Sequence, residues 1–423
     1  MTTMMMASEV DAGVLTWDQP AVAILPTFRV ADPALSKTVT IRNLVCACTG
    51  VPRRDLEFLF NANRLTARDV VASLRDFKIF TKFGEAFQYS NQMVATGGYI
   101  AASAEPGASS DLYADYLAAL QRRVLDPIGM TRTTFSIAAV ESGGDYASPH
   151  GATLKGAYEP LPLATEGLLQ PIAPAGSAWS TANDMARYLM TEIAKGVAPD
   201  GRRVVSAANL AETWKPQVAV DAQTGYGLGW FVQETDGLEL IFHGGNTLGF
   251  TSDLAFLPDA GIGIVVLANG QTSNVFNKAV RNRLLELLYA QPMAYGKIVS
   301  LALDQAAASL AAARASVGDY VDEPAARPYL GDYANDRLGA VTVALDASGH
   351  LSLDAGEFKT GLLPATDPAS GKSGYIAEDP PLAGIPFEFR SDGSIVLSAG
   401  TDEYVFKKRE PSTSATPEAS PSS

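Results

Sequence analysis

Two short groups of residues, far apart along the chain, carry side chains that enzymes use to move protons. Tyr89-Ser90-Asn91 follows a glycine-containing turn, and His243-Gly244-Gly245 ends an apolar run typical of a strand. Tyrosine and histidine both serve as general acids and bases. Each group alone is weak evidence, because a tyrosine ahead of a helix is usually a core or turn residue and a histidine at a strand end is usually a structural hydrogen-bonding partner. Their order, and the phrases around them, make the combination informative.

The segments around both groups resemble serine hydrolases of the class C β-lactamase and penicillin-binding-protein superfamily, which includes the family VIII esterases. The resemblance covers about residues 4–290 and keeps the family's order of motifs. The phrases that carry it are the run from Val10 to Pro52, Phe83-Gly84 through Asn91, Pro127-Ile128-Gly129-Met130-Thr131, Pro174-Ala175-Gly176 with Ser180-Thr181 and Asp184-Met185, Tyr226 to Trp230, His243-Gly244-Gly245, and Leu267-Ala268-Asn269.

This resemblance implies acyl transfer by a serine. A serine hydroxyl is a weak nucleophile at neutral pH and needs an adjacent base. In the family the serine opens a long helix in a Ser-x-x-Lys motif, so that the lysine one turn later lies on the same helix face. By the same resemblance, Tyr89 transfers protons to and from the nucleophile and the leaving group. Asn91 is expected to hydrogen-bond the catalytic lysine and the substrate carbonyl.

The resemblance also implies a substrate-binding strand at the second motif. His243 stands where many relatives carry the lysine of a Lys-Thr-Gly motif. Gly244 and Gly245 follow it, and the backbone N–H of Asn246 is expected to supply one donor of the oxyanion hole. Gly244 replaces the hydroxyl residue with which relatives bind the carboxylate of β-lactams and D-Ala peptides. This departure favours an ester, amide or peptide substrate without that carboxylate.

The larger departure is the nucleophile, since no Ser-x-x-Lys occurs in the 423 residues. The family pattern places that motif just before Met1, so the expectation is that the N-terminal part is missing, that its serine lies upstream, and that this chain alone is inactive. A signal peptide, and with it a periplasmic or secreted location, would belong to the same upstream part. The alternative is a non-catalytic relative that binds peptidoglycan-like or acylated ligands.

Other candidate residues do not form a second site. Ser90 is expected to point away from the tyrosine, and Ser36-Lys37 are adjacent rather than three apart, so they do not share a helix face. His150 and His350 lack recognisable partners, and His350 is expected in a solvated turn. The resemblance implies no cofactor, and the three histidines and two cysteines form no zinc pattern.

Composition excludes some partners and leaves others open. The net charge of −14 and the pI of about 4.7 argue against nucleic acid, since no basic stripe would neutralise phosphates. No run of 18 apolar residues predicts a membrane span. Cys46 and Cys48 are two apart, so on a helix they would point away from each other. A mutual disulfide is therefore not expected, and both are interpreted as small buried side chains.

Helical patterns dominate the first half of the chain. The expected helices are the N-terminal segment ending at Gly13, Thr40 to Cys48, Thr66 to Leu74, Gln92 to Ala102, an amphipathic helix capped by Ser110 with Tyr113, Leu117, Leu120 and Val124 on one face, and a helix from Thr181 to about Lys195. Residues 143–178 are rich in Gly, Pro and Ala and are expected to form a long loop.

The second half is predicted to be mainly β. Strands are expected at Tyr226–Trp230, Leu238–Phe242, Ser252–Leu257 and Ile262–Leu267, with a helix at Val275–Leu288. Their short connections favour antiparallel pairing. These elements predict an α+β fold, and the resemblance implies that it is β-lactamase/transpeptidase-like, in which helices flank an antiparallel sheet. We expect this hydrolase domain over 1–290, a helical linker over 291–326, a small all-β barrel or meander over 327–409, and a disordered tail over 410–423.

Overall fold

Residue contacts divide the computed structural model into two units, which are described separately. The structure describes residues 1–61, 64–235, 237–318, 321–366, 373–399 and 402–409. The first unit contains Met1–Ala152 and Tyr158–Ala307, and the second contains Thr153–Ala157 and the chain from Ala308 onwards. The division falls inside helix α15 (Tyr295–Ala315), none of whose residues is buried. The tail predicted at 410–423 lies outside the described residues.

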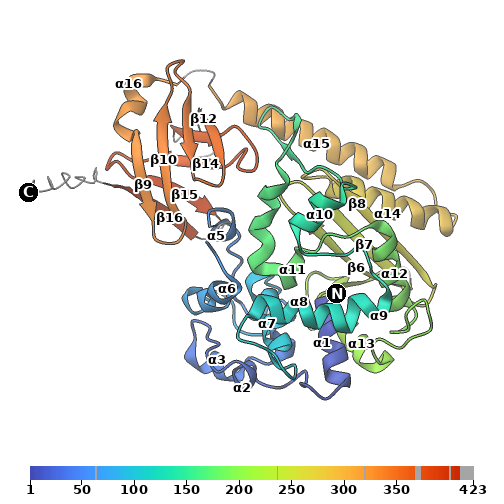
Figure 1. The fold of residues 1–423 in the computed structure, drawn as a ribbon. Coiled ribbons are helices and arrows are strands. Elements are labelled where there is room, and N and C mark those ends of the chain that lie inside the picture. The colour runs from blue at the N-terminus through green and yellow to red at the C-terminus, as the bar shows by residue number, and fades with distance from the viewer. Residues whose placement is uncertain (62–63, 236, 319–320, 367–372, 400–401, 410–423) are drawn as a thin grey trace, which may run out of the picture. The chain divides into compact units, whose positions relative to one another are not determined.

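The first unit is built on a six-stranded antiparallel sheet with the order β3-β4-β5-β6-β7-β8 (Figure 1). Each strand pairs with the next along the chain, which confirms the antiparallel arrangement. The strand predicted at Tyr226–Trp230 was wrong, because β4 ends at Tyr226 and Gly229 turns the chain with φ of +84° into β5, which the prediction missed. The strands span Val218–Ala219 (β3), Thr224–Tyr226 (β4), Phe231–Thr235 (β5), Leu238–Asn246 (β6), Thr251–Leu257 (β7) and Ile262–Ala268 (β8).

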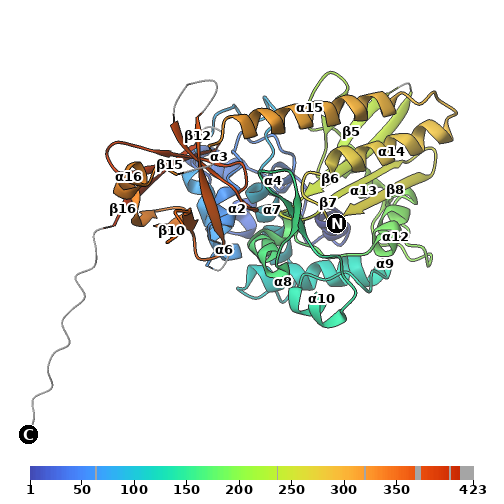
Figure 2. The same cartoon turned by 90° about the horizontal axis from the view of Figure 1, so that it is seen from above.

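Helices cover both faces of this sheet because side chains alternate along its strands. On one face, Asp253 and Thr251 of β7 bond to α14 (Asn274–Leu288) through Arg281 and Asn277. On the other face, Phe256 packs against Trp214 and Trp230 at ring-centroid distances of 5.4 and 5.3 Å. A Cβ at Gly263, which is paired with Phe256, would meet Leu189 and Ile193 of α12 (Ala182–Ile193). Figure 2 shows α12 and α14 on opposite sides of the strands.

A helical layer surrounds α7 (Asn91–Ser103), which lies against α1 (Thr2–Asp11), α4, α8 and α11. Two adjacent glycines inside α7 permit this close packing. A Cβ at Gly98 would overlap Pro174 and come within 2.9 Å of Thr2 Cγ2, and one at Gly97 would lie 2.9 Å from Val45 Cγ1. Glycine here costs helix propensity but allows backbones to approach.

The remaining helices of the first unit are short. They span Ala21–Ile24 (α2), Pro33–Thr38 (α3), Ile41–Val45 (α4), Leu56–Leu59 (α5), Ala67–Ser73 (α6), Leu74–Asp76 (η1), Leu112–Leu120 (α8), Gln121–Leu125 (η2), Asp126–Ile128 (α9), Ile137–Gly143 (α10), Leu163–Ile172 (η3), Ala173–Gly176 (α11) and Ala207–Trp214 (α13).

Most predicted helix starts are confirmed by their caps. The hydroxyls of Thr66 and Thr181 accept from the backbone N–H three residues on, at 3.2 Å in each case. The cap predicted at Ser110 was wrong. Asp111 is the N-cap of α8, and its carboxylate accepts from the N–H groups of Tyr113 and Ala114. A carboxylate also complements the positive end of the helix dipole, which a serine does not.

The long loop predicted over 143–178 was only partly right. This segment contains a two-stranded hairpin, β1 (His150–Ala152) with β2 (Tyr158–Pro160), and the helical turns η3 and α11. The 3-10 helix η3 spans ten residues and buries Glu166, Leu168 and Ile172. Its 3-10 geometry and internal Pro171 hide the period of 3.6 on which the helix prediction relied.

The expectation for the cysteines was wrong, because Cys46 and Cys48 form a disulfide with a Cα–Cα distance of 5.2 Å. The predicted helix from Thr40 to Cys48 in fact ends at Val45, so helical geometry does not apply to the cysteines. Ala47 between them has φ of +51°, which turns both side chains to the same side. The carbonyls of this turn hold the segment before Tyr89, since the N–H groups of Gly84 and Gln88 donate to Cys48 O and Ala47 O at 2.7 Å.

A buried carboxyl group in α1 predicts a pH-dependent stability. Glu9 is fully buried, and neither of its carboxylate oxygens has a hydrogen-bond partner among the described residues. Burial raises the pKa of Glu9 well above its usual value, and the nearby Glu105 adds to this, while Arg123 opposes it. A carboxyl group whose pKa is raised in the folded state is neutral in both states at low pH. Stability is therefore lost as the pH rises above the unfolded pKa.

We therefore expect Glu9→Gln to be more stable than the natural chain at pH 8, by at least about 1 kcal/mol or several degrees in Tm, and to differ little at pH 4. Urea unfolding followed by tryptophan fluorescence measures this for the first unit, which contains all four tryptophans. Glu85→Gln, at an exposed position, is the matched control. A stability difference that does not grow with pH would contradict the prediction.

The second unit is a closed eight-stranded barrel, which confirms the predicted small all-β domain. Consecutive strands pair in order, and β16 closes on β9. Strands β10 and β11 alternate buried and exposed residues, with Val341, Val343, Leu351 and Leu353 inside. Its elements are α16 (Glu323–Ala326), η4 (Arg327–Tyr329), β9 (Gly331–Asn335), β10 (Gly339–Leu345), β11 (Leu351–Asp354), β12 (Lys359–Thr366), β13 (Ser373–Ala377), β14 (Pro386–Phe389), β15 (Ile395–Ala399) and β16 (Asp402–Lys408).

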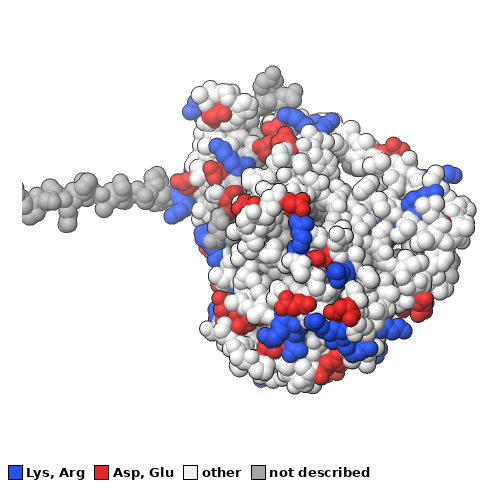
Figure 3. Space-filling view, turned by 45° about the vertical axis from the view of Figure 1, so that its right-hand side comes forward, with Lys and Arg blue, Asp and Glu red and all other residues white. Residues whose placement is uncertain are grey.

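The surface carries charges of both signs. On the face in Figure 3, Lys and Arg lie interspersed with Asp and Glu. Among the described residues, the structure contains no helix with the length and apolar character that a membrane crossing requires.

Candidate active site

Tyr89 stands directly before α7, the helix at the centre of the helical layer. Ser90 is the N-cap residue of α7, and Asn91 is its first residue. The buried hydroxyl of Ser90 donates to the Pro52 carbonyl at 3.0 Å, so it is held against the backbone as the sequence indicated. The half-buried ring of Tyr89 instead faces the sheet, where it makes an edge contact with Tyr226 at 6.2 Å between centroids.

His243, in the middle of β6, lies next to Tyr89. Their ring centroids are 6.0 Å apart, although the residues belong to different layers of the fold. His243 Nε2 lies 3.2 Å from the hydroxyl oxygen of the buried Tyr226, and Nδ1 lies 2.7 Å from the Gly244 carbonyl. Because a carbonyl only accepts, Nδ1 carries the proton, and Nε2 accepts from the Tyr226 hydroxyl.

Burial sets the protonation of these groups. It raises the pKa of Tyr89, with the positive charge of Arg53 opposing it, and it raises the pKa of Tyr226 well above the usual value. Burial lowers the pKa of His243, and its bond to the Gly244 carbonyl only partly offsets this. At neutral pH both phenols are therefore protonated and the imidazole is neutral. The site presents proton donors and a hydrogen-bonding imidazole without net charge on the rings.

Aromatic side chains form the wall behind these residues. Phe87 lies 5.3 Å from Tyr226 and 5.8 Å from Phe231 between ring centroids. Phe231 lies 5.4 Å from His243. This packing holds the rings of the site in place and excludes water from one side of it. The sequence analysis missed Tyr226 as a site residue, although it belongs to a segment that carries the resemblance.

Asn91 is held by a charged pair that the sequence analysis also missed. Its Nδ2 donates to Asp55 Oδ1 at 3.1 Å, and Asp55 forms an ion pair with Arg53. The Arg53 guanidinium lies over the Tyr89 ring at 5.8 Å. The signal was the run Arg53-Arg54-Asp55 directly after the Gly50-Val51-Pro52 turn.

The end of β6 carries the remaining predicted residues. Gly244, Gly245 and Asn246 pair with Asp253, Ser252 and Thr251 of β7. Gly244 and Asn246 are exposed. A Cβ at Gly245 would overlap the Ser252 hydroxyl, whereas one at Gly244 would meet only Ser252 O at an ordinary 3.5 Å. Packing therefore leaves room for a side chain at Gly244.

Because a side chain fits at Gly244, the effect of the hydroxyl that relatives carry at this position can be tested by substitution. We expect Gly244→Thr to fold normally and to bind a ligand with a carboxylate next to its acyl group, such as benzylpenicillin, about tenfold more tightly, the scale of one hydrogen bond to a charged group. Isothermal titration calorimetry measures this without turnover. Gly143→Thr, at a glycine with open space around it, is the matched control. Equal affinity in all three proteins would contradict a role for this position in carboxylate binding.

The buried carboxylate of Glu166 holds the turn that follows Asn246. Glu166 Oε1 accepts from Gly249 N at 2.7 Å and from Thr247 Oγ1 at 3.1 Å. A Cβ at Gly249 would overlap Pro149, and Phe250 packs on Trp179 at 5.4 Å between centroids. The end of the strand that carries Gly244 to Asn246 is thus held in one conformation.

Other candidate residues lie elsewhere. Ser36 is buried and bonds to Val30, and His150 lies beside Asn269. His350 is in an exposed turn of the barrel with Asp346 and Ser348, as expected. Among the residues that the structure describes, no three His, Cys, Asp or Glu side chains form a group that could hold a metal ion.

The chain is similar to several known proteins. The family model Beta-lactamase matches residues 1–289. An unguisins hydrolase of Aspergillus campestris is 24% identical over 265 residues, which cover 60% of this chain and 47% of that protein, so the chain spans about half the length of this relative. Penicillin-binding protein 4 of Amycolatopsis lactamdurans is 30% identical over 281 residues, which cover 63% of this chain and 69% of that protein.

Solved structures share the fold. An octameric penicillin-binding protein homologue from Pyrococcus abyssi matches with a TM-score of 0.59 and 20% identity, over 96% of this chain and 86% of that one. A D-stereospecific amidohydrolase from Streptomyces matches with a TM-score of 0.52 and 18% identity, over 64% of this chain and 79% of that one. With a family model that matches more than half of its residues, the chain belongs to the β-lactamase family of serine hydrolases.

Proposed function

We propose that this chain carries the proton-transfer and oxyanion-binding residues of a serine hydrolase that cleaves an ester or amide through an acyl-enzyme. The observation that carries the proposal is the approach of Tyr89 and His243, whose ring centroids are 6.0 Å apart. The names of similar proteins, a hydrolase, a penicillin-binding protein and an amidohydrolase, support acyl transfer as the reaction class.

In this proposal Tyr89 moves the proton. The serine oxygen bonds to the substrate carbonyl carbon, its proton passes to the Tyr89 oxygen, and the leaving group takes the proton as its bond to carbon breaks. Water then attacks the acyl-enzyme by the reverse route. Burial raises the pKa of Tyr89. Tyr89 accepts this proton only as the phenolate, and the positive charge of the lysine in a Ser-x-x-Lys motif would lower the pKa of Tyr89 so that the phenolate forms.

The other residues bind rather than react. Asn91 holds the lysine and the substrate carbonyl, at the point where Asp55 orients its amide. The neutral His243 contacts the substrate from β6, with the Gly244 carbonyl fixing its tautomer. The N–H of Asn246 stabilises the oxyanion together with the N–H of the nucleophile. Gly244 leaves the position next to the histidine open, which suits a substrate without a carboxylate.

The 423 residues contain no Ser-x-x-Lys, so the test must supply the serine and the lysine. The test extends α1 at its N-terminus by a helical turn that contains Ser-x-x-Lys. We expect the 423-residue chain to show only background hydrolysis of p-nitrophenyl esters and no labelling by a fluorophosphonate. The extended chain should do both, and a serine-to-alanine version of the extension should do neither. Robust phosphonate-sensitive activity of the 423-residue chain would require another nucleophile.

The alternative function is binding without turnover of peptidoglycan-like or acylated ligands. One observation favours it: the 423 residues contain no Ser-x-x-Lys, whereas the residues around Tyr89 and His243 remain together. In this case the extended chain stays inactive, and an acylated peptide binds the 423-residue chain in a manner that Tyr89→Phe weakens.

A further inference from the structure

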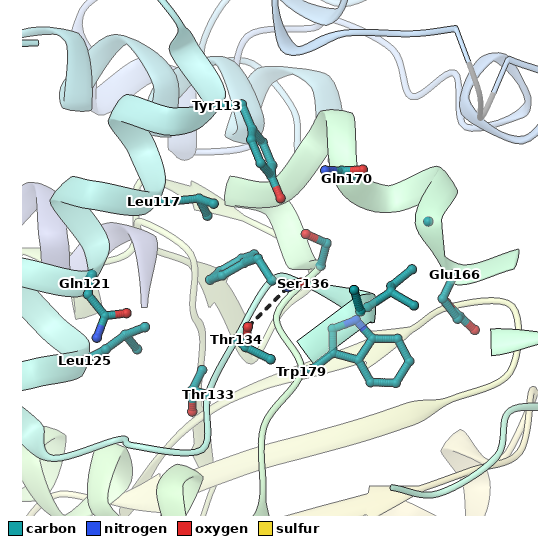
Figure 4. A pocket seen from close by; sticks show the side chains of 15 residues that line it. Tyr113, Leu117, Gln121, Leu125, Thr133, Thr134, Ser136, Glu166, Gln170 and Trp179 are labelled. Atoms are coloured by element: carbon teal, nitrogen blue, oxygen red, sulfur yellow. Dashed lines mark hydrogen bonds between the residues drawn. The ribbon is translucent and has the colours of Figure 1, made fainter. Parts of the chain in front are cut away.

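A cavity in the first unit lies among residues that the proposed reaction does not use. It has a volume of about 490 Å³ and lies between α8, the start of α10, η3 and Trp179 (Figure 4). Tyr89, Asn91, His243 and the glycines of β6 are not among the residues that line it. Its volume is typical of sites for small organic molecules.

Aromatic and aliphatic side chains form its walls. Tyr113 and Leu117 belong to α8. Phe135 lies between α9 and α10, Ile137 begins α10, and Trp179 lies in the segment before α12. These rings are held from behind, since Phe135 packs on the buried Tyr116 at 5.9 Å and Trp179 packs on Phe250 at 5.4 Å between centroids. Tyr113 and Leu117 belong to the helix face that the sequence predicted to be apolar. The cavity is thus preformed and suited to a flat apolar group.

One polar group in the wall lacks a partner. The Ser177 hydroxyl is buried and has no hydrogen bond among the described residues, although Ser177 lines the cavity. An unsatisfied buried hydroxyl costs free energy that a ligand carbonyl or N–H would recover. In contrast, Thr134 Oγ1 already accepts from Ser136 N, as the dashed line in Figure 4 marks.

The charge around the cavity selects against anions. Among the described residues that line it there is no lysine or arginine, and Glu166 is the one charged residue. In Figure 4 Glu166 lies at one end, beyond Trp179. Its Oε1 already accepts from Thr247 and Gly249, which holds the carboxylate in place, and its negative charge repels a negative ligand. A buried carboxylate in a region of low dielectric acts strongly on a neighbouring charge.

We propose that this cavity is a binding site for an uncharged aromatic amide. The aromatic ring of the ligand packs between Tyr113, Phe135 and Trp179, and its amide hydrogen-bonds Ser177. Glu166 and Trp179 also contact the turn of residues 247–250, so the occupant touches the side chains that fix the end of β6. The site does not depend on the acyl-transfer reaction proposed above.

The test uses two probes that differ only in charge, N-acetylphenylalaninamide and N-acetylphenylalanine, with the 423-residue chain. Calorimetry or ligand-observed NMR should show the amide binding with a Kd of about 1 mM or tighter and the carboxylate at least about tenfold more weakly. Ala138→Trp, at an exposed residue that lines the cavity, should abolish binding of the amide. Ala139→Trp, at the exposed neighbour that does not line it, should leave binding unchanged.

Two further variants distinguish binding in the cavity from binding at the candidate active site and from a purely structural effect. Glu166→Gln removes the charge, so it should bring the affinities of the two probes closer together, a change that a purely structural role would not produce. Tyr89→Phe should leave binding of the amide unchanged. No binding of the amide, equal binding of both probes, or binding lost in Tyr89→Phe but kept in Ala138→Trp would overturn the proposal.

Discussion

Replacing Tyr89 by phenylalanine in a chain that also carries the serine and lysine should lower turnover by about 10²-fold or more, the scale of a general acid–base group. The substitution removes only the hydroxyl, so the ring contacts with Tyr226 and His243 remain. Because the proton must move when the acyl-enzyme forms and when it breaks, kcat should fall while KM changes little. Steady-state hydrolysis of a p-nitrophenyl ester measures both constants.

The matched control is Tyr113→Phe, which removes a phenol oxygen from the same unit but away from β6. It should hydrolyse the ester at the natural rate. The pH profile adds a second readout, since loss of a titrating group in Tyr89→Phe should flatten the alkaline side of the kcat profile. A near-natural rate in Tyr89→Phe would remove this residue from the mechanism and leave His243 as the proton carrier to be tested.

The fold could be predicted where a local signal has one physical meaning. Thr66 and Thr181 each precede an acidic residue by three positions, and both start helices. The signal at Ser110 was ambiguous because Asp111 follows it, and a carboxylate is the stronger cap beside a helix dipole. The prediction missed β5 because this strand follows the turn at Gly229 directly. The predicted strand before it therefore extended to Trp230, whereas β4 ends at Tyr226.

The sequence predicted only the site residues that belong to a recognisable motif. Tyr89 and His243 were chosen from short sequence patterns, and the fold places their rings together. Tyr226 belongs to a segment that carries the resemblance, and Arg53 and Asp55 follow the Gly50-Val51-Pro52 turn, but neither segment marked them as site residues. They enter the site because the sheet and the loop after Cys48 carry them there. Partners that depend on tertiary packing cannot be derived from spacing along the chain.

The disulfide between the two cysteines was missed for a similar reason, because it depends on backbone geometry that spacing along the chain does not show. Spacing of two excludes a disulfide only inside a helix, and one residue with positive φ, Ala47, removes that condition. Because the turn at Cys46–Cys48 accepts hydrogen bonds from Gly84 and Gln88, it helps to place the segment that ends at Tyr89. Because the helix was predicted to continue to Cys48, the prediction missed a turn that helps to position Tyr89.

Removing the cation of the buried pair between Arg281 and Asp253 should destabilise the first unit by about 3–5 kcal/mol, because it leaves an unpaired buried carboxylate. Arg281 is 3% exposed and Asp253 is 7% exposed, and the guanidinium Nη1 lies 2.8 and 3.1 Å from the two carboxylate oxygens. Asp253 pairs with Gly244 in the sheet, so this contact ties α14 to the strand end that carries the site. Arg281→Met is the variant, and urea unfolding followed by tryptophan fluorescence is the measurement.

The double variant Arg281→Met with Asp253→Leu should recover most of the lost stability, because an apolar pair of similar volume needs no desolvated charge. Arg132→Met, which breaks an ion pair with Asp145 at side chains 56% and 82% exposed, should cost less than about 1 kcal/mol. If Arg281→Met and Arg132→Met lowered stability equally, the buried pair would not hold α14 on the sheet. If the double variant were no more stable than Arg281→Met, the loss would come from packing over Phe242, where the guanidinium lies 4.6 Å from the ring centroid, rather than from charge.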